Sequence, residues 1–449
     1  MTPGRPSSTW CADSTTSTAS TRSWRPWPPP ATDPETHVPL SAIRPAHFPW
    51  FPYDGFTFCL GLADGDAAWT SGHTAAALDP ALGRMTVGGD MASQARTAYR
   101  KVLAILEAAG HGPADVTRVT ENITVAGLDE YAAAAAVRAE VFGDHQPVVR
   151  TVVVERLVRR AALIEVELHA VAGGGQTLAA SEPRAAGTWV PSPVRDGHDG
   201  AVYLPTMLPL DAAGEVVHPG DFVSQYAYCL DRAQDLLTAV GLSLDAAVTT
   251  YDYSTPATRD VYRRTHRVRA ERLGGAGVYP GAGGILMSRL HHPDVLVAID
   301  VTASRHPLEL VNPGWSRYDS LTYAPGVRAG RTLYMSGFAA LDMQTQQALH
   351  PDDIGAQAEV TYGAIRHLLE YAGLGPQDLV ETTEYCVASA IGDYRAVAGV
   401  RERLLGPPWP ASTGAICAAL LRPEFLLEVF PTAVYPEHAE PAENAGGSR

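Results

Sequence analysis

Three stretches of the chain carry the hydrophobic pattern of an amphipathic helix. In the first of them, apolar residues recur at steps of three and four, which places their side chains on one helix face. These positions are Ala95, Ala98, Tyr99, Val102, Leu106 and Ala109. The pattern predicts a helix that covers one side of a packed core.

The same polar residues bracket all three stretches. An Asp precedes a Gln by four residues, and the Gln precedes a Gly by sixteen. The Asp can accept hydrogen bonds from the free N–H groups that begin a helix, and the Gly can take the left-handed conformation that ends one. The three sets are Asp90, Gln94 and Gly110; Asp221, Gln225 and Gly241; and Asp353, Gln357 and Gly373. This regular spacing indicates three tandem copies of one domain.

The rest of each copy predicts one order of elements. Two strands precede the first helix, and a short strand and a second helix follow it. A proline then opens a closing pair of strands. These prolines are Pro147, Pro280 and Pro410. The predicted fold class is therefore α+β, with three β-β-α-β-α-β-β domains in tandem.

We expect the three domains to span residues 46–172, 187–304 and 317–436, with the second copy the most divergent. Two loops, at residues 172–187 and 305–317, would join them. Residues 1–45 are rich in Ser, Thr and Pro, a composition typical of a disordered leader. The residues from Glu437 onward are expected to fray.

Composition and charge exclude several kinds of partner. The net charge is −15 and no long basic stretch occurs, so a nucleic-acid partner is not expected. No apolar run reaches the length of a membrane span. Five scattered cysteines favour a reducing cytoplasm and predict neither disulfides nor a metal site. Lys101 is the one lysine in the chain, and its place on a polar helix face argues against Schiff-base chemistry.

Several motifs connect the copies to a known family. Copy one contains Thr70-Ser71-Gly72-His73 and Ile164-Glu165-Val166-Glu167, and copy three contains Met335-Ser336-Gly337-Phe338 and the strand with Leu427-Glu428. These motifs resemble the RidA (YjgF) family of reactive-intermediate deaminases. The resemblance covers copies one and three better than copy two.

The resemblance implies an assembly and a chemistry. RidA proteins are homotrimers with ligand pockets in the clefts between subunits, and they hydrolyse enamine or imine acids without metal or cofactor. The fused chain is then expected to be a single-chain pseudo-trimer, either a monomer or a homodimer of such units. Its partner would be a small carboxylated substrate.

The resemblance also implies site residues. The family uses a glutamate on the last strand for the proton and the water, assisted by a tyrosine and a serine. The glutamate is matched by Glu165 and Glu428, with Ala298 in copy two. Matches to the serine are Ser71 and Ser336, with Thr206 in copy two; the tyrosine is matched by Tyr323, with Phe58 in copy one. Copy three keeps all three, so its cleft is expected to work, with Glu428 as acid and base.

The family's carboxylate-binding arginine has no direct match. Its positions hold Val149, Ala282 and Ser412, and Arg150 comes one residue late in copy one. A one-residue shift on a strand turns a side chain to the opposite face unless a bulge restores it.

Copy two offers another source of positive charge. Arg263 and Arg267 lie four residues apart on one helix face, and Tyr253 lies on the strand before that helix. The two arginines either form a solvated stripe or supply the missing anchor across an internal interface, with Tyr253 as a further substrate-binding residue.

Three functions therefore remain open. The first is a cofactor-independent RidA-like enzyme acting on an enamine, imine or related carboxylated intermediate, in specialised metabolism. The second is a chorismatase-like lyase or hydrolase, because copy two and Pro410-Ala411-Ser412-Thr413-Gly414 also resemble features of that tandem family. The third is an inactive ligand-binding or scaffold protein, whose clefts would be filled by apolar side chains.

Overall fold

The computed structural model describes residues 40–46, 48, 55–179 and 193–436. The chain divides into two compact units, residues 1–35 and 36–449, and every described residue lies in the second. The expected tail and most of the expected leader fall outside the described residues. The end of that leader is structured, because β1 (Ser41–Ala42) pairs with β2 (Gly61–Asp64).

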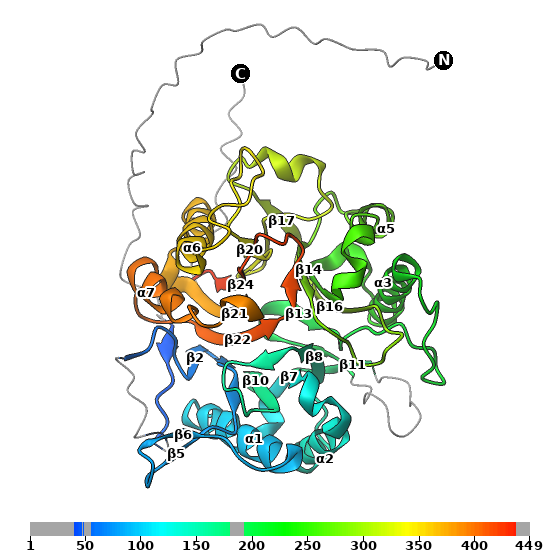
Figure 1. Ribbon diagram of the computed structural model, residues 1–449. Helices are drawn as coiled ribbons and strands as arrows, with labels where there is room; N and C mark the ends of the chain where they lie inside the picture. Colours follow the sequence, from blue (N-terminus) through cyan, green and yellow to red (C-terminus); the bar gives the residue numbers. More distant parts are fainter. Residues whose placement is uncertain (1–39, 47, 49–54, 180–192, 437–449) are drawn as a thin grey trace, which may run out of the picture. The chain divides into compact units, whose positions relative to one another are not determined.

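Three large sheets repeat one strand order (Figure 1). The first sheet runs β1, β2, β3 (Ala67–Thr70), β10 (Ile164–Val171), β7 (Val116–Thr124) and β8 (Val148–Val154), and β4 (His73–Thr74) also pairs with β10. The second runs β11 (Thr177–Ala179), β12 (Val194–Asp196), β13 (Ala201–Tyr203), β16 (Val297–Ser304), β14 (Ala247–Ser254), β15 (Gly281–Leu286) and β23 (Ala419–Leu420).

The third sheet runs β17 (Leu308–Val311), β18 (Gly326–Ala329), β19 (Thr332–Met335), β24 (Leu427–Val434), β21 (Leu379–Val387), β22 (Ala411–Cys417) and β9 (Arg156–Leu157), with β20 (Phe338–Ala339) also paired to β24. In each repeat the strand opened by the predicted proline pairs in parallel with the strand after the first helix. This shared order confirms the predicted α+β fold class and its repetition.

The long helices begin and end where the bracketing residues predict. They are α1 (Met91–Ala108), α3 (Phe222–Ala239) and α6 (Ile354–Tyr371). The preceding Asp of each accepts a hydrogen bond from a backbone N–H three residues later. Gly110, Gly241 and Gly373 have φ of 85°, 77° and 76°, the left-handed conformation that ends a helix.

The second helical segments are shorter. They are α2 (Tyr131–Phe142), α4 (Arg259–Tyr262) with α5 (Thr265–Arg272), and α7 (Arg395–Leu404). Short 3₁₀ turns connect the elements: η2 (Pro113–Asp115), η3 (Val125–Glu130), η4 (His198–Gly200), η5 (Leu244–Ala246), η6 (Pro256–Thr258), η7 (Ser316–Ser320), η8 (Pro376–Asp378) and η9 (Ala388–Ala390). A hairpin of β5 (Ala77–Asp79) and β6 (Arg84–Thr86) precedes α1.

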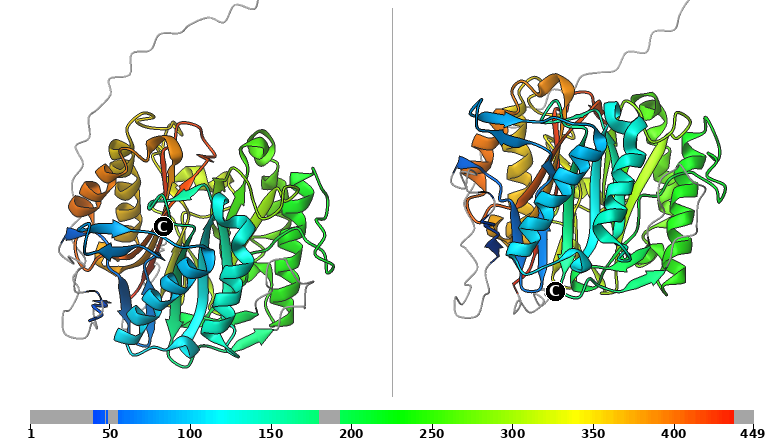
Figure 2. Two further views of the ribbon diagram at one scale, coloured as in Figure 1. Left: turned by 60° about the horizontal axis from the view of Figure 1, so that its bottom comes forward. Right: turned by 90° about the horizontal axis from the view of Figure 1, so that it is seen from below.

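Within residues 36–449, the helices lie on the outer sides of the sheets (Figures 1 and 2). Each sheet packs one face on its own helices, and its other face turns toward the neighbouring repeats. One hydrophobic cluster accordingly draws residues from all three repeats, including Val152, Tyr253 and Tyr385.

Short segments cross between repeats in a cycle. β9 of the first repeat pairs with β22 of the third, and β23 of the third pairs with β15 of the second. Between the first and second repeats, the Thr151 N–H donates to Thr206 Oγ1 at 3.0 Å. Each repeat therefore contacts both of the others within one chain.

The two expected linkers carry structure of their own. β11 lies in the first linker and pairs with β12, whereas β17 and η7 lie in the second, where β17 pairs with β18. β17 forms the outer edge of the third sheet, so this sheet begins before the expected domain boundary at residue 317.

The cyclic exchange predicts the size of the particle. Since each repeat already has both neighbours within one chain, trimerisation of whole chains is not needed. Light scattering should give the mass of one chain or of a dimer. An obligate trimer of the full chain would contradict the cyclic arrangement.

Candidate functional site

The last long strand of each repeat carries a residue at one equivalent position, next to a neighbouring repeat. Glu165, Ala298 and Glu428 occupy it on β10, β16 and β24. Their partners on the adjacent strand are Asn122, Tyr253 and Tyr385. The three interfaces between repeats, called clefts below, therefore start from the same geometry and differ in their side chains.

The cleft between the second and third repeats contains Glu428. The side chain is buried, and burial, followed by the nearby Asp252, raises the pKa of Glu428 to about 8. Glycines make room for it: a Cβ on Gly337 would collide with the Glu428 carboxylate, and one on Gly283 of β15 would collide with the Phe430 ring. At neutral pH Glu428 is therefore mostly a protonated acid.

A group of aromatic residues and one arginine gathers on the same repeat. Arg317 on η7 donates from Nη2 to the Tyr323 hydroxyl at 3.1 Å, and its guanidinium lies 5.0 Å from the centre of the Tyr318 ring. Tyr318 interacts electrostatically with both Arg317 and Glu428. The Nε of Arg317 is buried and has no hydrogen-bond acceptor. A cation with an unused donor thus lies beside Tyr318, which also interacts with the acid.

The second repeat holds this segment in place. Arg269 on α5 donates to the carbonyl oxygen of Thr322 at 3.0 and 3.2 Å, directly before Tyr323. It also donates to the Tyr226 hydroxyl at 3.0 Å and to Thr250 Oγ1 at 2.8 Å. The cleft is therefore built from both repeats.

Each repeat has a cluster of a buried carboxylate, tyrosines and an arginine between its helices and the strand that follows its first helix. In the second repeat, Tyr262 donates to the two oxygens of Asp252 at 2.9 and 2.7 Å, and burial raises the pKa of Asp252 to about 7. The related sets are Tyr99, Glu121, Tyr131 and Arg138 in the first repeat and Tyr362, Glu384, Tyr394 and Arg401 in the third. These clusters tie the helices to the sheet in every repeat.

The two expected serines bridge neighbouring repeats. Ser336 donates to the Ala324 carbonyl at 2.6 Å and accepts from the Ala282 N–H of the second repeat at 2.9 Å. Ser71 donates to the Cys59 carbonyl at 2.5 Å and accepts from the Ser412 N–H of the third repeat at 2.8 Å. Each hydroxyl proton is therefore used within its own repeat, and each hydroxyl oxygen accepts from a strand of the next repeat.

The cleft between the first and third repeats has two carboxyls. Burial, followed by the neighbouring Glu167, raises the pKa of Glu165 to about 8. Thr413 of the third repeat donates to Glu167 at 2.5 Å, while Glu165 Oε2 is buried without a partner. Within the described part of the chain, no arginine forms an ion pair with Glu165.

Arg150 seals the cleft between the first and second repeats. It donates to the carbonyls of Leu204 at 3.2 Å and Val301 at 2.7 Å and to the Thr302 hydroxyl at 2.9 Å. The β7–β8 pairing is regular, so no bulge redirects Arg150. Ala298 here replaces the acid and belongs to an apolar cluster. Arg150 thus holds two repeats together and leaves this cleft without the expected acid.

The other expected substrate-binding residues lie away from Glu428. Arg263 and Arg267 are exposed, and Arg267 pairs with Glu271 on its own helix at 2.8 Å. Tyr253 is buried; it accepts from Tyr385 at 3.2 Å and donates to Asp300 at 3.4 Å. The single helix expected to carry both arginines is broken: Arg263 lies in the turn between α4 and α5, whereas Arg267 lies on α5. The contact of α5 with the third repeat is made by Arg269.

Sequence reasoning missed Arg317 because it lies at the end of an expected linker. Its position six residues before Tyr323 could have indicated the contact. Arg317 lies in the 3₁₀ turn η7, and the chain after this turn brings Tyr323 to its side chain. Asp252 and Arg269 lie in the polar cluster of copy two, yet their contacts with the third repeat depend on how the domains pack.

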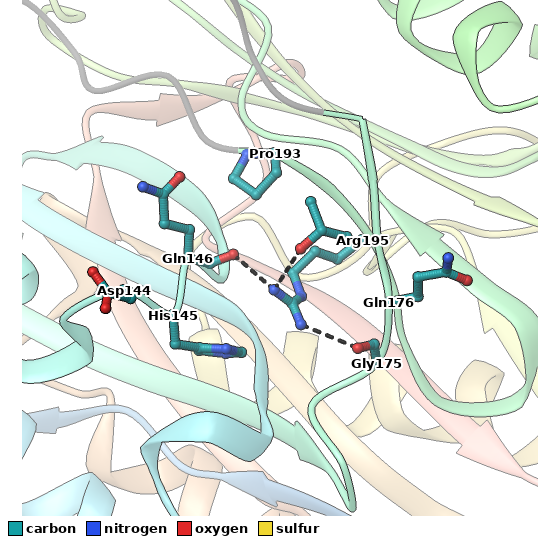
Figure 3. Close-up of a pocket in the computed structure, with 8 residues that line it drawn as sticks. Asp144, His145, Gln146, Gly175, Gln176, Pro193 and Arg195 are labelled. Atoms are coloured by element: carbon teal, nitrogen blue, oxygen red, sulfur yellow. Dashed lines mark hydrogen bonds between the residues drawn. The ribbon is translucent and has the colours of Figure 1, made fainter.

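A surface hollow of about 560 Å³ lies near Arg195 (Figure 3). The Arg195 guanidinium donates to the carbonyls of Gln146 at 3.1 Å, Gly174, and Gly175 at 3.1 Å, and to Thr177 Oγ1 at 2.9 Å. These bonds use the arginine to fasten a loop, and Glu165 and Glu428 do not line this hollow.

The described residues lack two kinds of feature. No three His, Cys, Asp or Glu side chains there are grouped as metal ligands. In the same residues no helix combines the length and apolar character needed to cross a bilayer.

Comparison with known proteins decides the family. The model of the family described as endoribonuclease L-PSP matches residues 57–172 and 318–435, together just over half of the chain. The chain belongs to this family. The expected membership of the RidA (YjgF) group is thereby confirmed, and the two matches fall on the first and third repeats.

Two curated relatives match single repeats. The RutC family protein PH0854 of Pyrococcus horikoshii is 38% identical over 90 residues, which cover 20% of this chain and 68% of that protein. The 3-aminoacrylate deaminase RutC of Acinetobacter baylyi is 26% identical over 127 residues, 28% of this chain and 98% of that protein.

A solved chorismatase spans more of the chain. The match covers 72% of this chain and 94% of the chorismatase, with 15% sequence identity and a TM-score of 0.47. Similarity at this level carries no argument about activity.

The contacts of Arg150 predict a difference in stability between two arginines. Arg150→Ala removes a donor from each of two buried carbonyls, Leu204 and Val301, and should lower the free energy of unfolding by roughly 1–3 kcal/mol. Arg267→Ala, a matched change at an exposed position, should leave it unchanged. Urea unfolding of both variants measures the difference, and an Arg150→Ala variant as stable as the unaltered chain would refute the sealing role.

Proposed function

We propose that this family member is an enzyme of the RidA type whose working cleft lies between the second and third repeats. Its substrate is a small carboxylated enamine, imine or related intermediate, and the chain works as a pseudo-trimer with domains near residues 46–172, 187–304 and 317–436. One observation carries the proposal. Glu428, a buried acid with a raised pKa, interacts with Tyr318, whose ring also contacts Tyr323 and Arg317.

Each residue has a chemical task in this proposal. Arg317 binds the substrate carboxylate, since a guanidinium fork suits two carboxylate oxygens. Tyr323 and Tyr318 orient the arginine and the substrate. Ser336 sets β15 against the cleft through its bond to Ala282, and Arg269 fixes the backbone before Tyr323.

Glu428 handles the protons. Hydrolysis of an imino acid adds one water across the C=N bond and releases ammonia and a 2-oxo acid. The protonated Glu428 gives its proton to the substrate, and the carboxylate then takes a proton from the attacking water. The acid returns to its starting form, so no further reactant is consumed.

The alternatives fit less of the structure. A scaffold protein would have clefts filled by apolar side chains, and the cleft between the first and second repeats has the apolar Ala298 in place of the acid. The cleft with Glu428 does not, because it contains an acid, an arginine and two tyrosine hydroxyls. The relative RutC is named a 3-aminoacrylate deaminase, which supports the substrate class proposed for this chain.

Removing the acid tests the proposed cleft. Glu428→Gln should lower kcat/KM for an enzymatically generated imino acid about 10²–10⁴-fold. Glu165→Gln, the equivalent change in the cleft between the first and third repeats, should cost much less. Coupled product assays measure both, with circular dichroism to verify folding. Equal, small losses in the two variants would favour a non-catalytic protein.

The raised pKa predicts a pH dependence. If Glu428 acts as the acid, kcat/KM should be steady below its pKa and fall as pH rises through about 8. A Glu428→Gln variant should lack this fall. A profile that rises with pH in the unaltered chain would assign the essential form to the carboxylate instead.

The carboxylate anchor has its own test. Arg317→Gln should raise KM roughly 10–100-fold, the range expected when a hydrogen bond to a charged group is lost. Arg263→Gln, an exposed arginine of the neighbouring repeat, serves as the matched control and should leave KM unchanged. Unaltered KM in the Arg317→Gln variant would exclude Arg317 as the anchor.

A further inference from the structure

The buried carboxylate cluster of the second repeat departs from the other two. The carboxylates occupy one equivalent position on β7, β14 and β21, and they are Glu121, Asp252 and Glu384. An arginine follows each carboxylate by seventeen residues, on the second helical segment of the repeat. These arginines are Arg138, Arg269 and Arg401. The same pair of groups is therefore repeated three times, and the second carboxylate is shorter by one methylene.

Where the carboxylate is long, the arginine pairs with it. Arg138 Nη1 donates to Glu121 at 2.5 Å, and Arg401 Nη1 donates to Glu384 at 3.2 Å. Both arginines are buried, and the glutamate compensates the charge of each. Each of these ion pairs joins a helix to the sheet of its own repeat.

In the second repeat the arginine turns to the neighbouring repeat instead. Arg269 and Asp252 interact electrostatically, but among the described residues they form neither an ion pair nor a hydrogen bond with each other. Two donors of Arg269, Nε and Nη2, go to the Thr322 carbonyl of the third repeat at 3.2 and 3.0 Å. One methylene shortens the reach of a carboxylate by about 1.5 Å, so the aspartate leaves the guanidinium free for this bond.

The interface between the first and third repeats provides a comparison within the same chain. The third repeat sets β22 against the first repeat as the second sets β15 against the third. One backbone bond recurs at both interfaces, from the Cys59 N–H to the Pro410 carbonyl at 3.2 Å and from the Ala324 N–H to the Pro280 carbonyl at 3.0 Å. By this register Thr57 corresponds to Thr322. Arg401 nevertheless donates to Glu384 and Ser412 of its own repeat. The backbone contact is thus general, whereas the arginine contact belongs to the interface with Glu428.

Thr322 directly precedes the residues that are proposed to bind the substrate. Tyr323 accepts from Arg317 at 3.1 Å, and its ring lies 5.6 Å from the ring of Tyr318. Tyr318 in turn interacts with Glu428. A shift of the backbone at Thr322 would therefore displace the side chains that orient the substrate carboxylate.

We propose that Asp252 is a positioning residue for the Glu428 site, because its short side chain leaves Arg269 to hold Thr322 and thereby sets Tyr323 and Arg317. This inference rests on the proposed function. Asp252 acts through Arg269, across the interface between two repeats. A longer carboxylate at this position would take the arginine back, as in the other two repeats, and would release the segment from residue 317 to 324.

Asp252→Glu tests this role by adding one methylene without a change of charge. The amide hydrogens of residues 317–324 should exchange faster with solvent, as measured by mass spectrometry on the full chain. KM for an enzymatically generated imino acid should rise about 10-fold with kcat nearly unchanged, since the segment binds the substrate and Glu428 transfers the protons. Glu121→Asp, the opposite change in the first repeat, is the matched control and should alter neither KM nor the exchange of this segment.

A second variant separates positioning through Arg269 from altered packing. Arg269→Gln should raise KM to the same extent, and Asp252→Glu added to it should change KM no further. Additive rises in KM would overturn the proposal, because Asp252 would then act by another route. A crystal structure of the Asp252→Glu variant in which Arg269 still bonds the Thr322 carbonyl would overturn it as well.

Two features of the design keep the outcome clear. Hydrogen exchange needs no substrate, so it tests the control of the segment separately from the proposed function, which fails by itself if the unaltered chain converts no imino acid. If Asp252→Glu does not fold, Arg269→Gln decides the matter, since unchanged KM and unchanged exchange of residues 317–324 in that variant would overturn the proposal.

Discussion

The structure depends on burying the inner face of each sheet. Helices cover only one face, so the other, with side chains such as Tyr203, Tyr253 and Phe430, must pack on a neighbouring repeat. A single domain exposes that face to water, at a cost that grows with the apolar area. Three fused copies cover it within one chain, and the crossing strands β9 and β23 extend the pairing from one repeat to the next.

Fusion also frees the three clefts to differ. Identical subunits form identical clefts, whereas here each cleft joins a different pair of repeats. Arg150 and Ala298 seal one cleft, and a second holds Glu165 and Glu167 without an arginine in ion-pair contact with Glu165. The third combines Glu428 with Arg317. The Arg118–Glu381 pair shows the same freedom at the centre, since three identical residues there could not form it.

Local chemistry explains what the sequence could predict. The Asp and Gly brackets and the opening prolines depend on neighbouring residues only, and the structure confirms them. The equivalent placement of Glu165 and Glu428 follows from strand order. Contacts between repeats could not be predicted in this way: Arg150 reaches Val301 and Arg269 reaches Thr322 through packing. Arg317 lies at the end of an expected linker, and Arg263 is exposed in the turn between α4 and α5.

The central claim is that one cleft of three binds and converts the substrate. A crystal structure of the full chain with a 2-oxo acid, the product class of imine hydrolysis, tests it most directly. The account predicts the ligand between the second and third repeats, with its carboxylate on Arg317 and its carbonyl carbon near Glu428. A ligand bound beside Glu165, or equally in more than one cleft, would contradict it.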